Sequence, residues 1–370
     1  MGVCMNNLSE LINLNNFGPS KDEIPDFNKM LSGVKKDIFS KPLFSSCQIC
    51  KKVGIKFCHS HTIPQFILKN IAEKGILYNT QVFNNTPFMD VENGIAKTQI
   101  FKSICAECDS KIFQEYENPN NWINMPSSNM LSQIALKDHL YYQYKLTRDL
   151  KMIEYANSQF AKMIGIKENK TPYYNLFQTW SLDKKDHARR VQKIYKSIEQ
   201  NKNLFELGYY KKLPYVIPIV FQGTFAMYFD LKDRKINNPF TSKIDGLSNV
   251  YFCLYPFQDS SIIVVFHENN EKYKIFFEEF NNLDLDEQLS IINFLIFAYS
   301  EDIFISKNID QSILNDINMQ KTAFVQPISI TKKSDAKNMQ KARLDAFKKE
   351  YRIINHRQCP NLLSQRFSIQ

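Results

Sequence analysis

The chain has 370 residues, of which 44% are hydrophobic and 23% charged, as in an ordinary globular protein with room for two domains. Its formal net charge of +9 is compatible with a polyanionic partner but does not identify one. Eight cysteines in so long a chain argue against a disulfide-stapled scaffold, and four of them form two Cys-x-x-Cys pairs that favour metal binding in a reducing compartment.

The chain shows no sign of export or membrane insertion. Its first residues lack the basic stretch followed by an apolar stretch that marks a signal peptide. The longest apolar run, residues 289–299, is too short to cross a bilayer. We therefore expect a cytoplasmic protein without a membrane partner.

Changes in residue composition and pattern along the chain predict four parts. Residues 1–40 are a polar lead-in, and residues 41–120 are a zinc-stabilised module that ends at an Asn-Pro-Asn-Asn turn signal. Residues 121–330 are expected to form an α+β domain. Residues 331–370 are a basic tail, read either as a solvated terminal helix or as a nucleic-acid contact.

The third part begins with a helical pattern. Ser127 and Ser128 can cap a long helix that runs toward residue 163. A second helix is expected to start after Ser181 and to carry Val191 and Ile194 on one face.

After residue 214 the pattern changes to that of strands. Residues 215–229 read as a strand interrupted near Gly223, and residues 250–254 and 262–267 as further strands. Residues 273–277 are expected to complete a hairpin with the preceding strand. A helix through residues 289–298, which either Asp284 or Asp286 can cap, follows. The predicted fold class is α+β, with a mainly antiparallel sheet and helices.

The four paired cysteines, Cys47, Cys50, Cys105 and Cys108, suit one tetrahedral zinc ion. The stretch between the pairs is much longer than the roughly 15–20 residues of familiar zinc modules. Either the pairs hold one zinc that clamps the ends of a small domain, or each pair is incidental or completes a separate site with Cys58, His59 or His61. We favour one shared site, because zinc would replace a core that so short a module cannot build.

The residues between the two cysteine pairs indicate a catalytic site. Residues 57–63 and 99–104 read as two strands, and Cys108-Asp109 opens a helix. This order could place His61 opposite Asp109. A neutral histidine facing a carboxylate that holds a hard cation suits phosphodiester hydrolysis, with His61 taking a proton from water.

The motifs Cys47-x-x-Cys50, Ser60-His61-x-Ile63-Pro64 and Cys105-x-x-Cys108-Asp109 resemble the zinc-knuckle branch of the HNH (His-Me finger) endonucleases. The resemblance covers about 70 residues and implies a zinc-clamped ββα-metal module. It implies that His61 is the general base, that the four cysteines bind structural Zn²⁺, and that Asp109 binds a catalytic Mg²⁺ or Mn²⁺.

The sequence departs from the family pattern at Ser60, where most of this branch has an aspartate that binds metal. His59, Glu115 or Glu117 could compensate, and His59 is retained as a further candidate ligand. Glu115 and Glu117 are more typical of a solvated helix face. His139 and His187 have no partner pattern in the sequence and are left out.

The leading hypothesis is a metal-dependent HNH-like endonuclease that hydrolyses DNA, with RNA as the other candidate substrate. By family habit it would serve in bacterial defence against foreign DNA, and a homo-oligomer or partner protein would dock through the C-terminal domain. The alternative is an inactive zinc-stabilised module that binds nucleic acid or protein. A third reading places the function in the C-terminal domain as a structural or regulatory protein.

Overall fold

The computed structural model describes residues 42–83, 91–238, 246–323 and 348–369, with scattered residues between 29 and 40. The predicted lead-in over residues 1–40 lies almost entirely outside the described residues. So does much of the basic tail, up to residue 347.

The chain divides into two compact units. The first comprises Met1–Thr62, Gln99–Leu204 and Phe240–Gly246, and the second comprises Ile63–Thr98, Phe205–Pro239 and Leu247–Gln370. The stretch between the two cysteine pairs is therefore shared. Its ends belong to the first unit, and its middle, Ile63–Thr98, belongs to the second.

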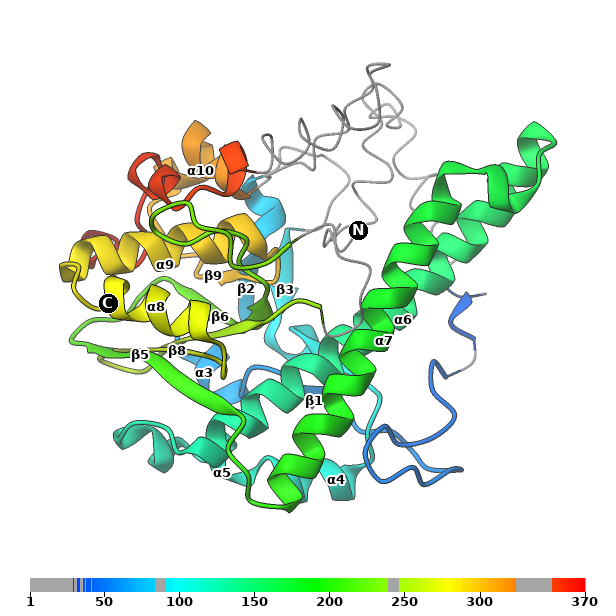
Figure 1. Cartoon of the computed structure of the whole chain (residues 1–370), viewed down its shortest axis with the longest axis horizontal. Coiled ribbons are helices and arrows are strands. Elements are labelled where there is room, and N and C mark those ends of the chain that lie inside the picture. The colour runs from blue at the N-terminus through cyan, green and yellow to red at the C-terminus, as the bar shows by residue number, and fades with distance from the viewer. Residues whose placement is uncertain are drawn as a thin grey trace. The chain divides into compact units, whose positions relative to one another are not determined.

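Two long helices, α6 (Ser128–Ile164) and α7 (Pro172–Glu199), lie side by side in the first unit (Figure 1). The side chain of Ser127 accepts a hydrogen bond from the Met130 amide, which confirms the predicted start of α6. The predicted start of α7 after Ser181 is wrong by about one third of the helix. Thr171 caps α7, and Pro172 follows at its first position, which suits a residue without an amide hydrogen.

The rest of the first unit is built from short elements. Strands β1 (Ser60–His61) and β4 (Ile100–Phe101) pair antiparallel, with Ser60 opposite Phe101. Helices α4 (Ala106–Ile112) and α5 (Gln114–Glu117) follow. The single helix expected here is broken at Phe113, whose φ of −102° and ψ of 9° leave the helical region.

The second unit is organised around a seven-stranded sheet in the order β3-β2-β9-β6-β7-β8-β5, in which all neighbouring strands are antiparallel. Its strands are β2 (Ile76–Asn79), β3 (Glu92–Gly94), β5 (Phe205–Leu213), β6 (Ile219–Phe225), β7 (Val250–Pro256), β8 (Ser261–Glu268) and β9 (Phe304–Ile305). Strands near residues 250–254 and 262–267 are thus confirmed. The strand predicted over 215–229 is shorter, and β5 was not predicted.

The strand predicted over residues 273–277 is wrong, because this stretch lies in helix α8 (Glu271–Phe280). The side chain of Asn270 accepts a hydrogen bond from the Lys272 amide and caps the helix. Tyr273, Phe276, Phe277 and Phe280 are buried at helical spacing. These aromatic side chains favour strands in isolation, but their period of three and four buries them together on one helix face.

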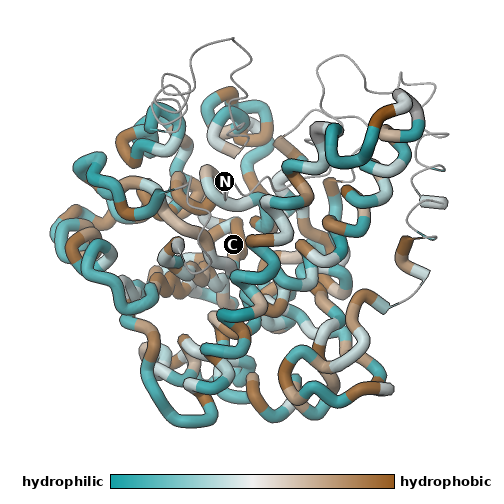
Figure 2. Tube along the Cα trace, turned by 45° about the vertical axis from the view of Figure 1, so that its right-hand side comes forward, coloured by the Kyte–Doolittle hydropathy of each residue, from teal (hydrophilic) through white to brown (hydrophobic). Residues whose placement is uncertain are grey.

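Helix α9 (Leu285–Tyr299) is capped by Asp284, whose side chain accepts from the Glu287 amide, as expected. Strands β6 and β7 are buried along their whole length. Figure 2 colours the trace by hydropathy and shows hydrophobic stretches interspersed with hydrophilic ones along the chain. The remaining elements are α3 (Gln65–Lys69), α10 (Ile317–Ala323) and the short turns η1 (Thr80–Phe83), η2 (Ile95–Lys97), η3 (Pro119–Ile123), η4 (Glu168–Lys170), η5 (Gln311–Asn315), η6 (Ile353–Gln358) and η7 (Gln365–Phe367). The fold is a mixture of helices and antiparallel sheets, as predicted.

Candidate functional site

The four paired cysteines come together in the first unit. Their sulfur atoms all lie within 4.8 Å of one another. The sulfur of Cys47 lies 3.8 Å from that of Cys108, and the sulfur of Cys50 lies 3.8 Å from that of Cys105. Each thiol of one pair thus faces a thiol of the other, as the shared-site hypothesis requires.

The spacing of the sulfurs fits a tetrahedral metal ion. Zinc binds thiolates at about 2.3 Å, so two sulfurs on one tetrahedral ion lie about 3.8 Å apart. A disulfide would bring two sulfurs to about 2.05 Å. The cysteines could therefore hold a metal ion such as zinc, and the donor set of four sulfurs suits it.

Backbone hydrogen bonds bring the two cysteine pairs together. The Gln48 amide donates to the Ser103 carbonyl at 2.9 Å, and the Cys58 amide donates to the Ile104 carbonyl at 3.0 Å. Lys51 takes a positive φ of 62° within the turn after Cys50. Cys105 is the N-cap of α4, so the second pair spans the first turn of that helix.

The thiols of the cluster differ in acidity. Burial raises the pKa of Cys47 and of Cys108 above that of an ordinary thiol. The exposed thiol of Cys50 has its pKa lowered to about 7, first by a hydrogen bond from the backbone of Lys52. Cys50 is accordingly the readiest of these three to offer a thiolate to a metal.

Cys58 and His59 stay outside the metal-capable group that the described residues form. The Cys58 thiol donates to the Ile104 carbonyl at 3.3 Å. Burial first, and then the negative charge of Asp109, raise its pKa to about 12. His59 is exposed at the surface.

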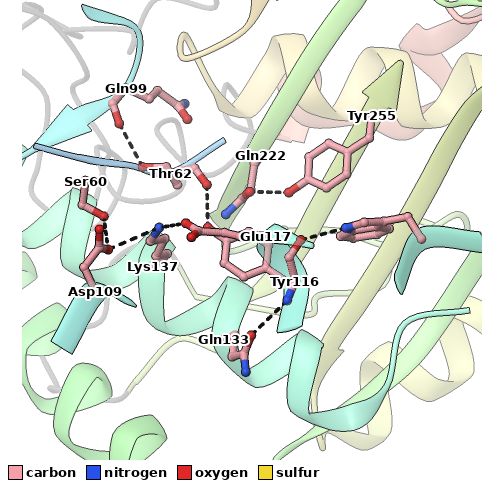
Figure 3. Close-up of polar contacts among 11 residues, drawn as sticks. Ser60, Thr62, Gln99, Asp109, Tyr116, Glu117, Gln133, Lys137, Gln222 and Tyr255 are labelled. Carbon is pink, nitrogen blue, oxygen red and sulfur yellow. Dashed lines mark hydrogen bonds and ion pairs between the residues drawn. The ribbon is translucent and has the colours of Figure 1, made fainter. Parts of the chain in front are cut away.

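Ser60 and Asp109 form a contact between strand β1 and helix α4. The Ser60 hydroxyl donates to Oδ1 of Asp109 at 2.6 Å, and Ser60 itself is buried (Figure 3). A hydroxyl that donates to a carboxylate orients it, so Ser60 has the role of a supporting group for Asp109.

His61 follows Ser60 on β1, where it pairs with Ile100 and is half-buried. Successive residues of an extended strand point to opposite sides, so His61 and Ser60 diverge. Ser60 of this dipeptide contacts Asp109 through its hydroxyl.

Sequence reasoning missed Lys137, which lies on α6 and is fully buried. Its ammonium lies 3.5 Å from Oδ1 of Asp109 and forms an ion pair with Oε1 of Glu117 (Figure 3). It also lies 4.6 Å from the centre of the Phe113 ring. A lysine inside an apolar stretch of a predicted helix is the signal that could have indicated a buried, paired ammonium.

The two glutamates of α5 have different roles. Glu115 accepts hydrogen bonds from Ser127 and from Asn129, so it stabilises the start of α6. Glu117 instead contacts Lys137 and shares that ammonium with Asp109. The structure thus separates two residues that the sequence left as equal alternatives.

Tyr116 holds Glu117 in place through its own contacts. The Tyr116 amide donates to Oε1 of Gln133 at 3.1 Å, and the Tyr116 hydroxyl donates to the Thr62 carbonyl at 3.0 Å. The Trp122 indole donates to the Tyr116 carbonyl at 2.8 Å. Figure 3 shows these bonds joining α5 to α6 and to the end of β1.

His139 and His187, set aside in the sequence, form a second polar cluster. Their Nδ1 atoms lie 2.8 Å apart across the α6–α7 contact. Burial first lowers the pKa of both, with that of His187 lowered to about 4. The close packing of two antiparallel helices is what brings together histidines so distant in the sequence.

Comparisons with protein-family models, with curated proteins and with solved structures found no match to this chain. Within the described residues, no helix combines the length and the apolar character needed to span a membrane.

Proposed function

We propose that the first unit is an HNH-like endonuclease centre that hydrolyses phosphodiester bonds in DNA, with the cysteine cluster holding structural zinc. The observation that carries the proposal is the Ser60–Asp109 contact at 2.6 Å, directly beside His61 and next to a helix that starts at the cysteine cluster. By the sequence resemblance, His61 would be the proton-accepting group and Asp109 a metal-binding group of this nuclease family.

In this proposal Asp109 holds a Mg²⁺ or Mn²⁺ ion, whose charge would stabilise the negative charge that builds on the phosphate. Carboxylate oxygens are the ligands such hard cations prefer. Ser60 orients Asp109 by its hydrogen bond. His61 accepts a proton from the attacking water, and its half-buried position leaves it reachable from solvent.

DNA is the proposed partner because of the charge on α7. Lys185, Arg189, Lys193 and Lys196 are exposed and recur at intervals of four, four and three residues, which places them along one helix face. Gln192 of the same helix donates to the Gln48 carbonyl at 3.1 Å, so this row of cations lies next to the first cysteine pair. Such a row suits the phosphate backbone of a nucleic acid.

The test is cleavage of plasmid DNA by zinc-loaded protein with Mg²⁺ or Mn²⁺. His61→Ala and Asp109→Ala should each lower the rate about 10²–10⁴-fold, as the loss of a general base or a metal ligand does. His59→Ala, at an exposed position two residues before His61 and outside the metal-capable group of the described residues, is the matched control and should keep the rate. Cleavage that survives His61→Ala would refute the mechanism, and parallel assays on RNA would identify the substrate.

One observation favours a second candidate function, a zinc-stabilised binding module without catalysis. The carboxylates of Asp109 and Glu117 are already paired with the ammonium of Lys137. DNA binding without cleavage under every metal tested would support this candidate over the first.

A further inference from the structure

Lys137 is unusual because its charge is buried while its partners reach the surface. The lysine side chain is 1% exposed, whereas those of Asp109 and Glu117 are 25% and 36% exposed. An ammonium in such a position loses its hydration, and this loss is tolerated only where negative charge replaces water. The carboxylates of Asp109 and Glu117, called the rim below, are therefore partly open to solvent, while the ammonium that they share is buried.

Among the described residues, Ser60, Lys137 and the Cys58 side chain contact the Asp109 carboxylate of the rim. Ser60 and Lys137 both contact Oδ1 of Asp109, and Lys137 contacts Oε1 of Glu117. This arrangement resembles the way two carboxylates share a single hard cation, with the ammonium where the ion would be.

We propose that Lys137 is a built-in counter-ion that occupies the place of a divalent cation between Asp109 and Glu117, so that metal binds there in competition with the ammonium. The proposal makes Glu117 a second carboxylate of the site and Lys137 a positioning residue. It rests on the proposed function for the class of cation, Mg²⁺ or Mn²⁺. A purely structural lysine would fasten α6 to α5 without affecting metal affinity.

Direct measurement of Mn²⁺ binding to the zinc-loaded chain, by the EPR signal of free Mn²⁺ and without DNA, tests the proposal. Mn²⁺ prefers oxygen ligands, so it leaves the thiolate site to zinc. Lys137→Met keeps an unbranched side chain, one atom shorter than lysine, and removes its charge. It should tighten Mn²⁺ binding at least about tenfold, since one charge at contact distance is worth more than that. Added Mn²⁺ should also raise the thermal midpoint of this variant more than that of the wild type.

Three further variants sharpen the result. Lys137→Gln removes the charge but keeps a hydrogen-bond donor, and it gives the same test if Lys137→Met does not fold. In the double variant Lys137→Met/Glu117→Gln the gain should disappear. Lys52→Met is the matched control, because Lys52 pairs with exposed Glu107 on α4 at 2.8 Å, and it should leave Mn²⁺ affinity unchanged.

Unchanged or weaker Mn²⁺ binding in both Lys137 variants would overturn the inference. The result is independent of catalysis. Tighter Mn²⁺ binding in a protein that never cuts DNA would uphold the inference and refute the proposed function, whereas metal-dependent cleavage without the gain would do the reverse.

Discussion

At the scale of single residues, Cys58 shows that position in the sequence does not decide which thiols meet. It lies between the two cysteine pairs, yet its thiol bonds to the Ile104 carbonyl and it is absent from the metal-capable group. Cys47 lies farther from the second pair in sequence, and its sulfur is 3.8 Å from that of Cys108.

The different surroundings of Cys47 and Cys58 can be tested with a matched pair of substitutions. Cys47→Ser should reduce bound zinc from about one ion per chain to well below half and should destabilise the first unit, because three thiolates hold zinc less tightly than four. Cys58→Ser should retain the metal. Metal analysis of the purified proteins measures both, and equal zinc loss in the two variants would contradict the four-cysteine site.

The histidine pair predicts how stability depends on pH. The pKa of His139 and of His187 is lowered in the folded chain, so the unfolded chain binds more protons below pH 6.5. Stability should be fully present above pH 6.5 and fall as the pH drops toward about 4, the value of His187, by up to about 1.4 kcal/mol per pH unit for each histidine. Arg190 and Lys193 add to the cost of charging His139, and Asp186 partly offsets it at His187.

His187→Gln should therefore flatten the dependence of the free energy of unfolding on pH between 6.5 and 4. Urea unfolding at several pH values measures it. His59→Gln, at an exposed position, is the control and should follow the wild type. Parallel curves for wild type and His187→Gln would show that the pair does not titrate as described.

At the scale of elements, α7 combines three faces with different partners. Val191 and Ile194 are buried, Asp186 pairs with Arg190 at 2.8 Å, and the outer face carries the exposed cations. The first two faces hold the helix in place. The side chains of Lys185, Lys193 and Lys196 on the outer face are exposed, so their charges can be reached by a partner.

Neutralising that outer face should weaken DNA binding without unfolding the chain. Replacing Lys185, Lys193 and Lys196 by Gln should lower affinity at low salt and reduce the slope of log affinity against log salt by up to about 3, roughly one unit per lost phosphate contact. Replacing the same number of exposed lysines in the second unit, Lys69, Lys97 and Lys212, is the comparison. Fluorescence anisotropy over a salt series measures both, and an unchanged slope would rule out this surface.

The elements that could be predicted from sequence are those with local signals. Ser127 and Asp284 cap their helices as expected, and the apolar runs of β7 and β8 form strands. Helix α8 could not be told from a strand by its aromatic content. The two-residue strand β9 carries no local signal, because it exists only through pairing with β2 and β6.

The candidate site likewise combines features that the sequence predicts with features that it does not. The meeting of the cysteine pairs could be predicted from the two Cys-x-x-Cys motifs and from zinc chemistry, in spite of the long stretch between them. The role of Lys137 does not, because burial of its ammonium depends on how α6 packs on α4 and α5. The catalytic roles of His61 and Asp109 stay predictions.

At the scale of the whole molecule, the metal-capable cluster and the hydrophobic core belong to different units. All four cysteines lie in the first unit, and the large apolar cluster is formed by residues of the second, such as Phe221, Phe252 and Phe294. Loss of metal should therefore affect the two units unequally.

Chelation of zinc is expected to raise hydrogen exchange in β1, β4 and α4, because these elements depend on the clamp for their contacts. Strands β6, β7 and β8 should keep their protection, since the core around them is apolar and independent of the metal. Exchange measured by mass spectrometry before and after chelation gives the comparison, with added zinc as the control. Simultaneous loss of protection in β7 would show that the units unfold together.

The passage of Ile63–Thr98 into the second unit has a consequence for biosynthesis. Strand β2 leaves the ribosome long before β9, its partner through Tyr78 and Ile305. At about 5–20 residues per second the wait is on the order of ten to fifty seconds. Cys47 and Cys50 meanwhile find their partners after 61 and 55 residues. A nascent chain that captures metal early would thus keep the ends of this segment together until translation supplies the rest of its sheet.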